Sequence, residues 1–440
     1  MVAKVPSNFR RVITAAAGGN VIEWYDFYIF GTLAVSVLAV KFFEKGHPSA
    51  ALITTVGIFT AGFLIRPLGA FLFGWLGDRV GRKYTFLLTL MGMALCTGAI
   101  GLVPTYDSIG FSAAIILLAL RMIQGLCLGG QYGGAITYVA EHVSDEHRGY
   151  YTGWLQTSPT LGIVLSLLVV IGTRTYFGNE VFNDWAWRIP FLFSFLLLFI
   201  AGYVRSQFEE SPVYAEIKAK GQTSKNPWRE AFLNSANLKY VIIASIVVLG
   251  QGVVWYSGQF WALYYLQTVS KVDVLHSAYI VGAGLLIGTP SLIFFGWLSD
   301  HIGRKPVILG GMLIAAVTYY PLYTWLGAAT QPNNINYPVA IIIVAIMVCY
   351  VGMVYGPIGA FLAEFFPARI RYTSVSVPYH IGNGRGGGLV PVITVAAYQA
   401  TGSLAYALIY PIAVPAVCFL LGLLLMPETR HNKIWETATA

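Results

Sequence analysis

The sequence predicts an all-α membrane protein whose twelve transmembrane helices form two related six-helix halves. Three observations support this fold class. Hydrophobic residues make up 57% of the 440 residues and charged residues only 10%, whereas about a quarter of an average soluble domain is charged. Long apolar runs follow one another with short breaks between them. A charged decapeptide, finally, occurs twice, at 74–83 and again at 296–305.

The apolar runs are bounded by glycine, proline and charged residues, and most hold the roughly 20 residues that one helical crossing needs. After its charged start, the first run has an alanine stretch at 15–17 that could mimic a cleavage site, but it continues through Ile22 to Val40 without a stop. We therefore interpret it as an uncleaved helix rather than a signal peptide. The predicted spans are 12–42, 52–76, 84–103, 110–139, 150–173, 187–205, 239–268, 276–298, 306–327, 337–362, 372–398 and 404–426.

A single long polar stretch separates the sixth span from the seventh. It is rich in lysine, arginine and glutamate, whereas the other loops are short. We therefore predict a first six-helix half at 1–205, a cytoplasmic linker at 206–238 and a second half at 239–440.

The net charge of +8 would suggest a nucleic-acid partner in a soluble protein. In a membrane protein, cations gather in cytoplasmic loops instead. With the N-terminus inside, 19 lysines and arginines lie on the cytoplasmic side and four outside. We therefore expect a multi-pass protein of the plasma or inner membrane, with both termini cytoplasmic and no nucleic-acid partner. The four cysteines lie in apolar runs without metal or redox spacing, so we expect no metal and no cofactor.

Two repeats indicate an internal duplication. The aspartates of the two decapeptides are separated by 300 − 78 = 222 residues. In addition, Glu141 precedes Arg148 by seven residues and Glu364 precedes Arg371 by seven, an offset of 364 − 141 = 223. Both features fall at the same place in each half, as expected for a repeated unit.

The pattern Gly-x-x-x-Asp-x-x-Gly-Arg-Lys resembles the loop between the second and third helices of major facilitator superfamily transporters. The resemblance implies a substrate site between the halves and alternating access by rocking. It also implies a cytoplasmic charge network that acts as a gate, although the cations could merely set topology. The expected gate residues are Asp78, Arg79, Gly81, Arg82, Lys83, Glu141, Arg148, Asp300, Arg304, Lys305, Glu364 and Arg371.

Five ionisable residues lie inside predicted spans, namely Glu23, Asp26, Arg66, Arg121 and Arg385. Charges at this depth usually have partners or line a pathway. Glu23 and Asp26 are three residues apart and so share a helix face. By depth, Glu23 could meet Arg66 and Asp26 could meet Arg121. Because a carboxylate beside a cation can act as a proton switch, we assign proton coupling to Asp26 or Glu23, with Arg121; the alternative is a purely structural ion pair.

The chain also resembles the metabolite:proton symporter family, in the first-helix run 19–27, in Arg66-Pro67-Leu68-Gly69-Ala70 and in the Arg-x-x-Gln-Gly motif at 121–125. Further likenesses lie at 129–134 and 378–384. Members of that family move carboxylates such as 2-oxoglutarate, citrate or shikimate, or zwitterions such as proline and betaines. Two positions depart from it, because many relatives have Glu at position 131 and an apolar or aromatic residue at position 385.

Three arginines against two acids inside the spans leave one positive charge, which favours an anionic substrate. Arginine suits bidentate recognition of a carboxylate. We therefore predict a monomeric transporter, not an enzyme, that imports a small mono-, di- or tricarboxylate by proton symport. The candidate substrate residues are Arg385, Arg66, Tyr132, Gln131, Gln251, Tyr256, Tyr379 and Asn383.

Two alternatives remain open. An osmolyte porter for proline or a betaine would need an aromatic cage for a quaternary ammonium group, which Trp255, Tyr256, Trp261, Tyr264 and Tyr265 could supply. A membrane redox subunit is remote, because haem would need paired axial histidines and only His380 lies well inside a span.

Overall fold

The structure is a computed structural model that describes residues 9–44, 46–80, 82–206, 235–331, 334–367 and 371–434. Most of the predicted linker lies outside these residues, so the predicted domain boundaries stay a prediction. The described chain is helical apart from its loops and one short hairpin. In that hairpin, β1 (Thr330–Gln331) pairs antiparallel with β2 (Asn334–Ile335).

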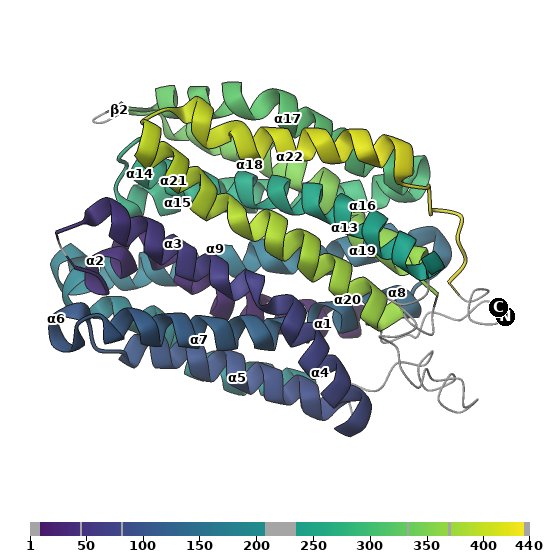
Figure 1. Ribbon diagram of the computed structural model, residues 1–440, viewed down its shortest axis with the longest axis horizontal. Helices are drawn as coiled ribbons and strands as arrows, with labels where there is room; N and C mark the ends of the chain where they lie inside the picture. Colours follow the sequence, from purple (N-terminus) through teal and green to yellow (C-terminus); the bar gives the residue numbers. More distant parts are fainter. Residues whose placement is uncertain are drawn as a thin grey trace.

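Residues 9–206 form one group of helices, drawn in purple to teal in the lower part of Figure 1. In order they are α1 (Phe9–Leu33), η1 (Ala34–Leu38), α2 (Ala39–Lys41), α3 (Pro48–Leu64), α4 (Arg66–Val80), α5 (Arg82–Leu102), α6 (Tyr106–Ile109), α7 (Ser112–Gly129), α8 (Tyr132–His142), η2 (Asp145–His147), α9 (Arg148–Asp184), η3 (Ala186–Arg188) and α10 (Ile189–Ser206).

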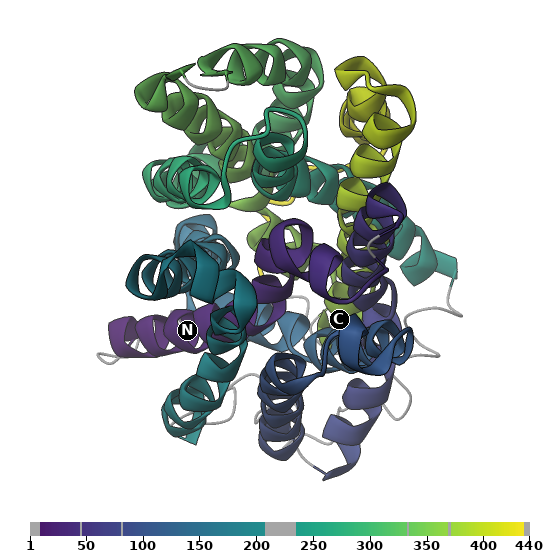
Figure 2. The same cartoon turned by 90° about the vertical axis from the view of Figure 1, so that its left-hand side faces the viewer.

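Residues 235–434 form a second group, in the upper part of Figure 1, and Figure 2 shows the same division from the end of the bundle. These helices are α13 (Ser235–Tyr256), η4 (Ser257–Trp261), α14 (Ala262–Thr268), α15 (Val274–Gly288), α16 (Pro290–Ile302), α17 (Arg304–Ala329), α18 (Tyr337–Tyr355), α19 (Ile358–Phe365), α20 (Arg371–Ile381), η5 (Gly382–Gly386), η6 (Gly387–Leu389), α21 (Val390–Thr401) and α22 (Leu404–Leu425).

All twelve predicted spans are helical, which confirms the predicted fold class. Two details differ from the prediction. The short α6 was not expected, and α9 continues to Asp184 instead of ending at 173, with a break in its helical backbone at Gly178 (φ 78°, ψ 166°). Most of this extension is exposed, as at Tyr176, which is 83% accessible, although Phe182 is buried. The apolar pattern therefore ended before the helical segment did.

The helices break at matching places in the two groups. The π-helical turns η1 and η4 start 257 − 34 = 223 residues apart. The second helix of each group is interrupted at Ile65 and at Thr289, which are 289 − 65 = 224 residues apart. A proline follows each interruption within two residues and lacks the amide proton that the preceding turn needs. The duplication seen in the sequence is therefore also present in the backbone.

The outer surface suits a lipid environment. Among the described residues, nine helices are long and apolar enough to cross a membrane, and 88–102 and 186–200 are shorter apolar helices. Large apolar side chains such as Phe199 and Leu424 are 77% and 82% exposed. Several buried charged side chains, such as Arg148, Arg304 and Glu364, instead lie between the two groups, where the candidate site lies.

Candidate functional site

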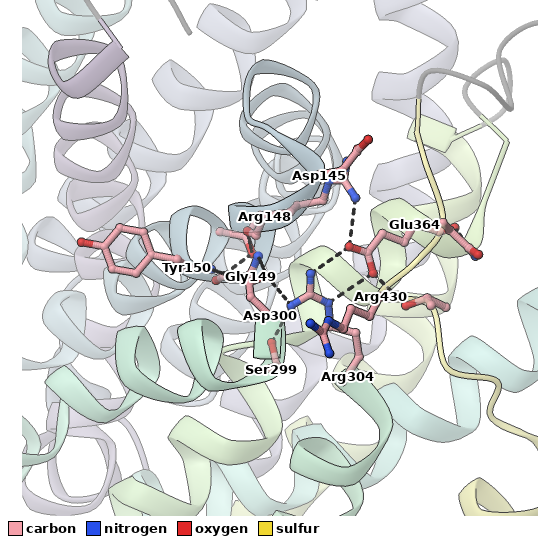
Figure 3. A network of polar contacts seen from close by, with 12 residues as sticks. Asp145, Arg148, Gly149, Tyr150, Ser299, Asp300, Arg304, Glu364 and Arg430 are labelled. Atoms are coloured by element: carbon pink, nitrogen blue, oxygen red, sulfur yellow. Dashed lines mark hydrogen bonds and ion pairs between the residues drawn. The ribbon is translucent and has the colours of Figure 1, made fainter. Parts of the chain in front are cut away.

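A buried cluster of charged side chains joins the two groups at the end of the bundle that holds α8, α16 and α19 (Figure 3). Glu364 Oε1 lies 2.9 Å from Arg148 Nη1 in α9 and 2.9 Å from Arg304 Nη2 in α17. Arg304 Nη1 also lies 2.6 Å from Asp300 Oδ1. All of these side chains except Asp300, which is 1% exposed, are fully buried. Because separating buried ion pairs is costly, the cluster joins the two groups firmly at this end.

Asp300 also caps a helix of the other group. Its Oδ1 accepts a hydrogen bond from Gly149 N and its Oδ2 accepts one from Tyr150 N, both at 2.8 Å. These amides belong to the first turn of α9, where no intrahelical acceptor exists. A carboxylate at this position also favours the positive end of the helix dipole. Asp300 therefore fastens α16 to the start of α9.

A second ion pair crosses between the groups. Arg371 Nη1 lies 2.9 Å from Glu141 Oε1, and the two side chains are 1% and 5% exposed. Glu141 thus pairs with Arg371, and Glu364 pairs with Arg148. In each seven-residue repeat, the acid therefore pairs with the base of the other repeat, which lies in the other group.

Of the other expected gate residues, Lys305 lies outside the cluster between the groups, and the side chains of the rest lie outside the described part of the chain. Lys305 donates from Nζ to Leu423 O at 2.9 Å and from its backbone N to Glu428 Oε2 at 3.0 Å, both within the second group. Gly81 and the side chains of Asp78, Arg79, Arg82 and Lys83 lie outside the described residues. Their role in the gate stays a prediction.

Arg66 lies at the seam between the groups and is fully buried. Its guanidinium carbon is 4.2 Å from the ring centre of Phe63, 4.3 Å from that of Phe27 and 5.4 Å from that of Trp24. The Tyr256 side chain of the second group lies next to it. None of its three side-chain nitrogens has a hydrogen-bond partner of normal geometry among the described residues. The expected hydrogen bond to Glu23, which is also fully buried, is therefore not formed.

The expected pair of Asp26 and Arg121 is also not formed. Arg121 donates to Phe27 O at 2.9 Å, and its guanidinium carbon lies 3.5 Å from the centre of the Phe27 ring. The Asp26 carboxyl lies beside Ser194 of α10, although neither of its oxygens makes a hydrogen bond of normal geometry within the described chain. Consecutive residues point about 100° apart around a helix, so Arg121 meets Phe27 and not the carboxyl of Asp26.

The Arg-x-x-Gln motif instead makes hydrogen bonds that lead to the backbone of the first helix. Arg121 Nη1 donates to Gln124 Oε1 at 3.1 Å, and Gln124 Nε2 donates to Thr97 Oγ1 of α5 at 2.7 Å. Thr97 in turn donates to the backbone oxygen of Asp26 at 3.1 Å. This chain of hydrogen bonds fixes the backbone around Asp26 and leaves its carboxyl out of the network.

Aromatic rings from both groups fill the centre around Arg66. Tyr28 stacks on Trp24 and on Trp255, with ring centres 5.0 and 5.5 Å apart. The Tyr28 and Tyr256 hydroxyls are 3.4 Å apart. Such a cluster can bind a cationic group by its ring faces while Arg66 holds an anionic group.

A tyrosine layer lies between this centre and the charged cluster. Tyr132 of α8 stacks on Tyr379 of α20, with ring centres 3.3 Å apart. Gln156 donates to the Tyr132 hydroxyl at 3.0 Å, and the Tyr355 and Tyr379 hydroxyls are 3.0 Å apart. Tyr379 follows Arg371 by two turns along α20, so the layer lies about two helical turns from the charged cluster.

The predicted amides take different positions. Asn383 donates to Gln251 Oε1 at 3.3 Å, which joins η5 to α13 near the centre. Gln131 instead donates to Thr89 Oγ1 of α5 at 3.0 Å, so this contact stays within the first group.

Arg385 corrects a prediction, because its side chain is exposed on the surface and does not lie in the centre. Its glycine neighbours explain this orientation. A Cβ at Gly384 would lie 2.8 Å from Phe63 O, and one at Gly382 would lie 2.7 Å from Leu249 N. Both inner faces of this helix are therefore filled by close backbone contacts, and a long side chain fits only on the outside. Of the five ionisable residues inside the predicted spans, two arginines and two acids then remain buried, not three and two.

Sequence reasoning did not single out Tyr28, Gln156, Tyr355 or Ser194 for the site. The signal that could have found Gln156 is the same one that found Arg121, a polar residue inside an apolar run. No comparable signal marks the tyrosines, because the chain contains 27 of them.

Comparisons with known proteins found similar chains along almost the whole sequence. The family model described as Major Facilitator Superfamily matches residues 16–377 and 291–440. The inner membrane metabolite transport protein YhjE of Escherichia coli K12 is 33% identical, covering 98% of this chain and 97% of the relative. The proline/betaine transporter of the same strain is 31% identical over 97% and 85% of the two chains. Its shikimate transporter is 32% identical over 89% and 88%.

Solved structures show the same fold. The xylose transporter XylE from E. coli, in a partially occluded inward-open conformation, superposes with a TM-score of 0.73 at 18% identity, over 97% of this chain and 100% of that one. Another structure of this proton:xylose symporter reaches a TM-score of 0.77 at 16% identity, over 97% and 98%.

Proposed function

The chain belongs to the Major Facilitator Superfamily of secondary transporters, and on that premise we propose that it imports a small organic acid together with a proton. The observation that carries the proposal is Arg66. It is fully buried between the two groups, and its nitrogens have no hydrogen-bond partner of normal geometry among the described residues. An unsatisfied buried guanidinium is costly, and a carboxylate is the ligand that matches its paired donors.

The charge count supports one net negative charge on the substrate. Two arginines, Arg66 and Arg121, balance Glu23 and Asp26 in the described interior. A proton on one acid leaves one positive charge, which a monocarboxylate would neutralise. Asp26 suits the proton site because its carboxyl oxygens make no hydrogen bond of normal geometry among the described residues, so protonation would break none.

Alternating access requires closures that can open in turn. At the charged cluster, the ion pairs and the tyrosine layer would have to separate. At the opposite end, Tyr264 donates to Gly31 O of the other group at 2.8 Å. Hydrogen bonds and ion pairs of this kind can be exchanged between two states of similar energy.

A second candidate is import of a zwitterion such as proline or a betaine. The stacked rings of Trp24, Tyr28 and Trp255 favour it, because they offer π faces to an ammonium group close to Arg66. A zwitterion also carries the carboxylate that Arg66 would hold, so both candidates use the same arginine.

The test is uptake of labelled lactate, shikimate, proline and glycine betaine into proteoliposomes, with and without an acid-outside gradient. Gradient-dependent accumulation of an acid without net current would support symport of a monoanion with one proton. Accumulation of proline or betaine with inward positive current would favour the second candidate. Arg66→Gln should abolish uptake of every substrate, whereas the matched control Arg385→Gln should leave it intact. Normal uptake by Arg66→Gln would contradict both candidates.

A further inference from the structure

A cavity of about 310 Å³ opens at the end of the bundle opposite the charged cluster. That end holds α2, α3, α14 and α21 (Figure 1). The cavity is lined from the first group by residues that include Val40, Glu44 and Leu52, and from the second group by Gln267, Lys271 and Gln399. Its volume falls in the range of small-molecule sites, about 300 to 1,000 Å³. The cavity therefore spans the seam, and with both termini cytoplasmic, as the sequence predicts, it would face the outside.

Contacts around Tyr264 separate this cavity from the aromatic centre around Arg66, and we call these contacts the closure. Thr268, which also lines the cavity, donates to Tyr264 O one helical turn away at 2.6 Å. Tyr264 itself donates to Gly31 O across the seam. A Cβ at Gly31 would lie 2.7 Å from Phe59 and 2.8 Å from Phe260, so the packing there is tight. A ligand in the cavity would therefore be separated from Arg66 until this closure opens.

Lys271 is held in an unusual backbone conformation at the cavity wall. Its φ of 54° is positive, although it is not a glycine, and such conformations are costly for other residues. Hydrogen bonds on both sides enforce it, from Ser270 N to Tyr265 O at 3.1 Å and from Val272 N to Leu266 O at 2.8 Å. The position of the side chain is thus set by the fold and not by the preference of lysine.

The charges around the cavity are not paired with one another. Within the described residues, Lys271 and Glu44 both line it without forming an ion pair together. The nearby carboxylate of Asp273 accepts from Leu275 N and from Arg174. Gln267 Oε1 is buried with no hydrogen-bond partner in the described chain. The cavity therefore combines one cation, one acid on the opposite wall and an unsatisfied amide oxygen with apolar walls.

We propose that this cavity is an external capture site, where Lys271 binds the carboxylate of the substrate before the closure at Tyr264 opens. The inference rests on the proposed function, because it assumes a carboxylate-bearing substrate. A plain monocarboxylate and a zwitterion share this group. Glu44 distinguishes these two kinds of substrate. It lines the cavity from the first group of helices, opposite Lys271, and would attract the ammonium of a zwitterion but no part of a plain monocarboxylate.

The test measures binding without transport, so that its failure is separate from failure of the proposed function. A Val40→Cys variant places a thiol on the cavity lining, and its rate of reaction with a membrane-impermeant maleimide is followed in the presence of shikimate, lactate, proline or glycine betaine. The chain without this substitution controls for the four native cysteines, three of which are buried. At least one probe should slow the labelling.

Lys271→Gly should then raise the concentration needed for half-protection by about tenfold, since a charge-assisted hydrogen bond is lost. Glycine adopts positive φ freely, so this variant should fold. Lys41→Gln, at the same end but outside the lining, should change nothing. Glu44→Gln should weaken protection by a zwitterion and not by a plain acid. The proposal is overturned if no probe protects the thiol. It is also overturned if the probes protect the thiol equally well in Lys271→Gly and in the chain that keeps Lys271.

Discussion

Glu141 at the end of α8 forms an ion pair of 2.9 Å with Arg371, the first residue of α20 in the other group. The equivalent residues Glu364 and Arg148 form the reciprocal pair, also at 2.9 Å. Both pairs therefore cross the seam, and both must separate for this end to open. Duplication of the chain explains this reciprocal pair of contacts, which we call the latch, because each copy supplies one acid and one base to the other copy.

Exchanging the charges of Glu141 and Arg371 tests this relationship. Glu141→Arg alone places two buried cations together, and Arg371→Glu alone places two buried acids together. Removing a buried partner costs about 3–5 kcal/mol, so each single variant should lose uptake and open the cluster. The double variant should recover a substantial part of uptake, measured in proteoliposomes at matched protein amounts. Double-variant activity no higher than the single variants would show that the pair does not act as a latch.

The seven-residue repeats predicted which residues gather at this end, but not how they pair. Sequence spacing places Glu141 and Arg148 near each other, and nothing in it indicates that each finds its partner in the other group. That choice depends on how α8 and α19 face each other across the seam, which is a property of the assembled bundle.

Asp26→Asn should separate coupling from transport. The carboxyl has no hydrogen-bond partner of normal geometry among the described residues, so an amide of the same size should fit without misfolding. We expect gradient-driven accumulation to fall to the level seen without a gradient, while exchange of labelled for unlabelled substrate persists. Ser36→Ala, a polar deletion in η1 of the same predicted span, serves as the control. Full accumulation by Asp26→Asn would remove the proton role from this residue.

Arg385→Gln should leave apparent substrate affinity unchanged within about twofold, because substitutions at exposed positions have small effects. The sequence argument placed Arg385 in the centre on the grounds that a charge at that depth must face inward. The free-energy cost of placing a charge in the membrane does not, however, determine which way the side chain points. Direction is decided here by the buried glycines around it, whose close contacts fill the inner faces. A rise in apparent KM of tenfold or more would place Arg385 at the substrate after all.

The last prediction concerns Gly149, at the start of α9 beside Asp300. A Cβ at this position would lie closer than 3.0 Å to Arg304 Nη1, Gly296 O and Asp300 Oδ1, all in the other group. Gly149→Ala should therefore push α9 and α16 apart at a cost of about 1–3 kcal/mol. States that interconvert in transport differ by only a few kcal/mol, so the population should shift toward opening at this end.

Spin labels at Glu146 and His301, which are exposed on opposite sides of the seam, would report this shift as longer distances between them. Gly172→Ala is the matched control, because it lies in the same helix and a Cβ there meets nothing within 4 Å. It gains the same helix propensity as Gly149→Ala, so any effect that both variants share comes from the helix itself. Unchanged distances in Gly149→Ala would mean that the close approach of α9 and α16 does not limit opening.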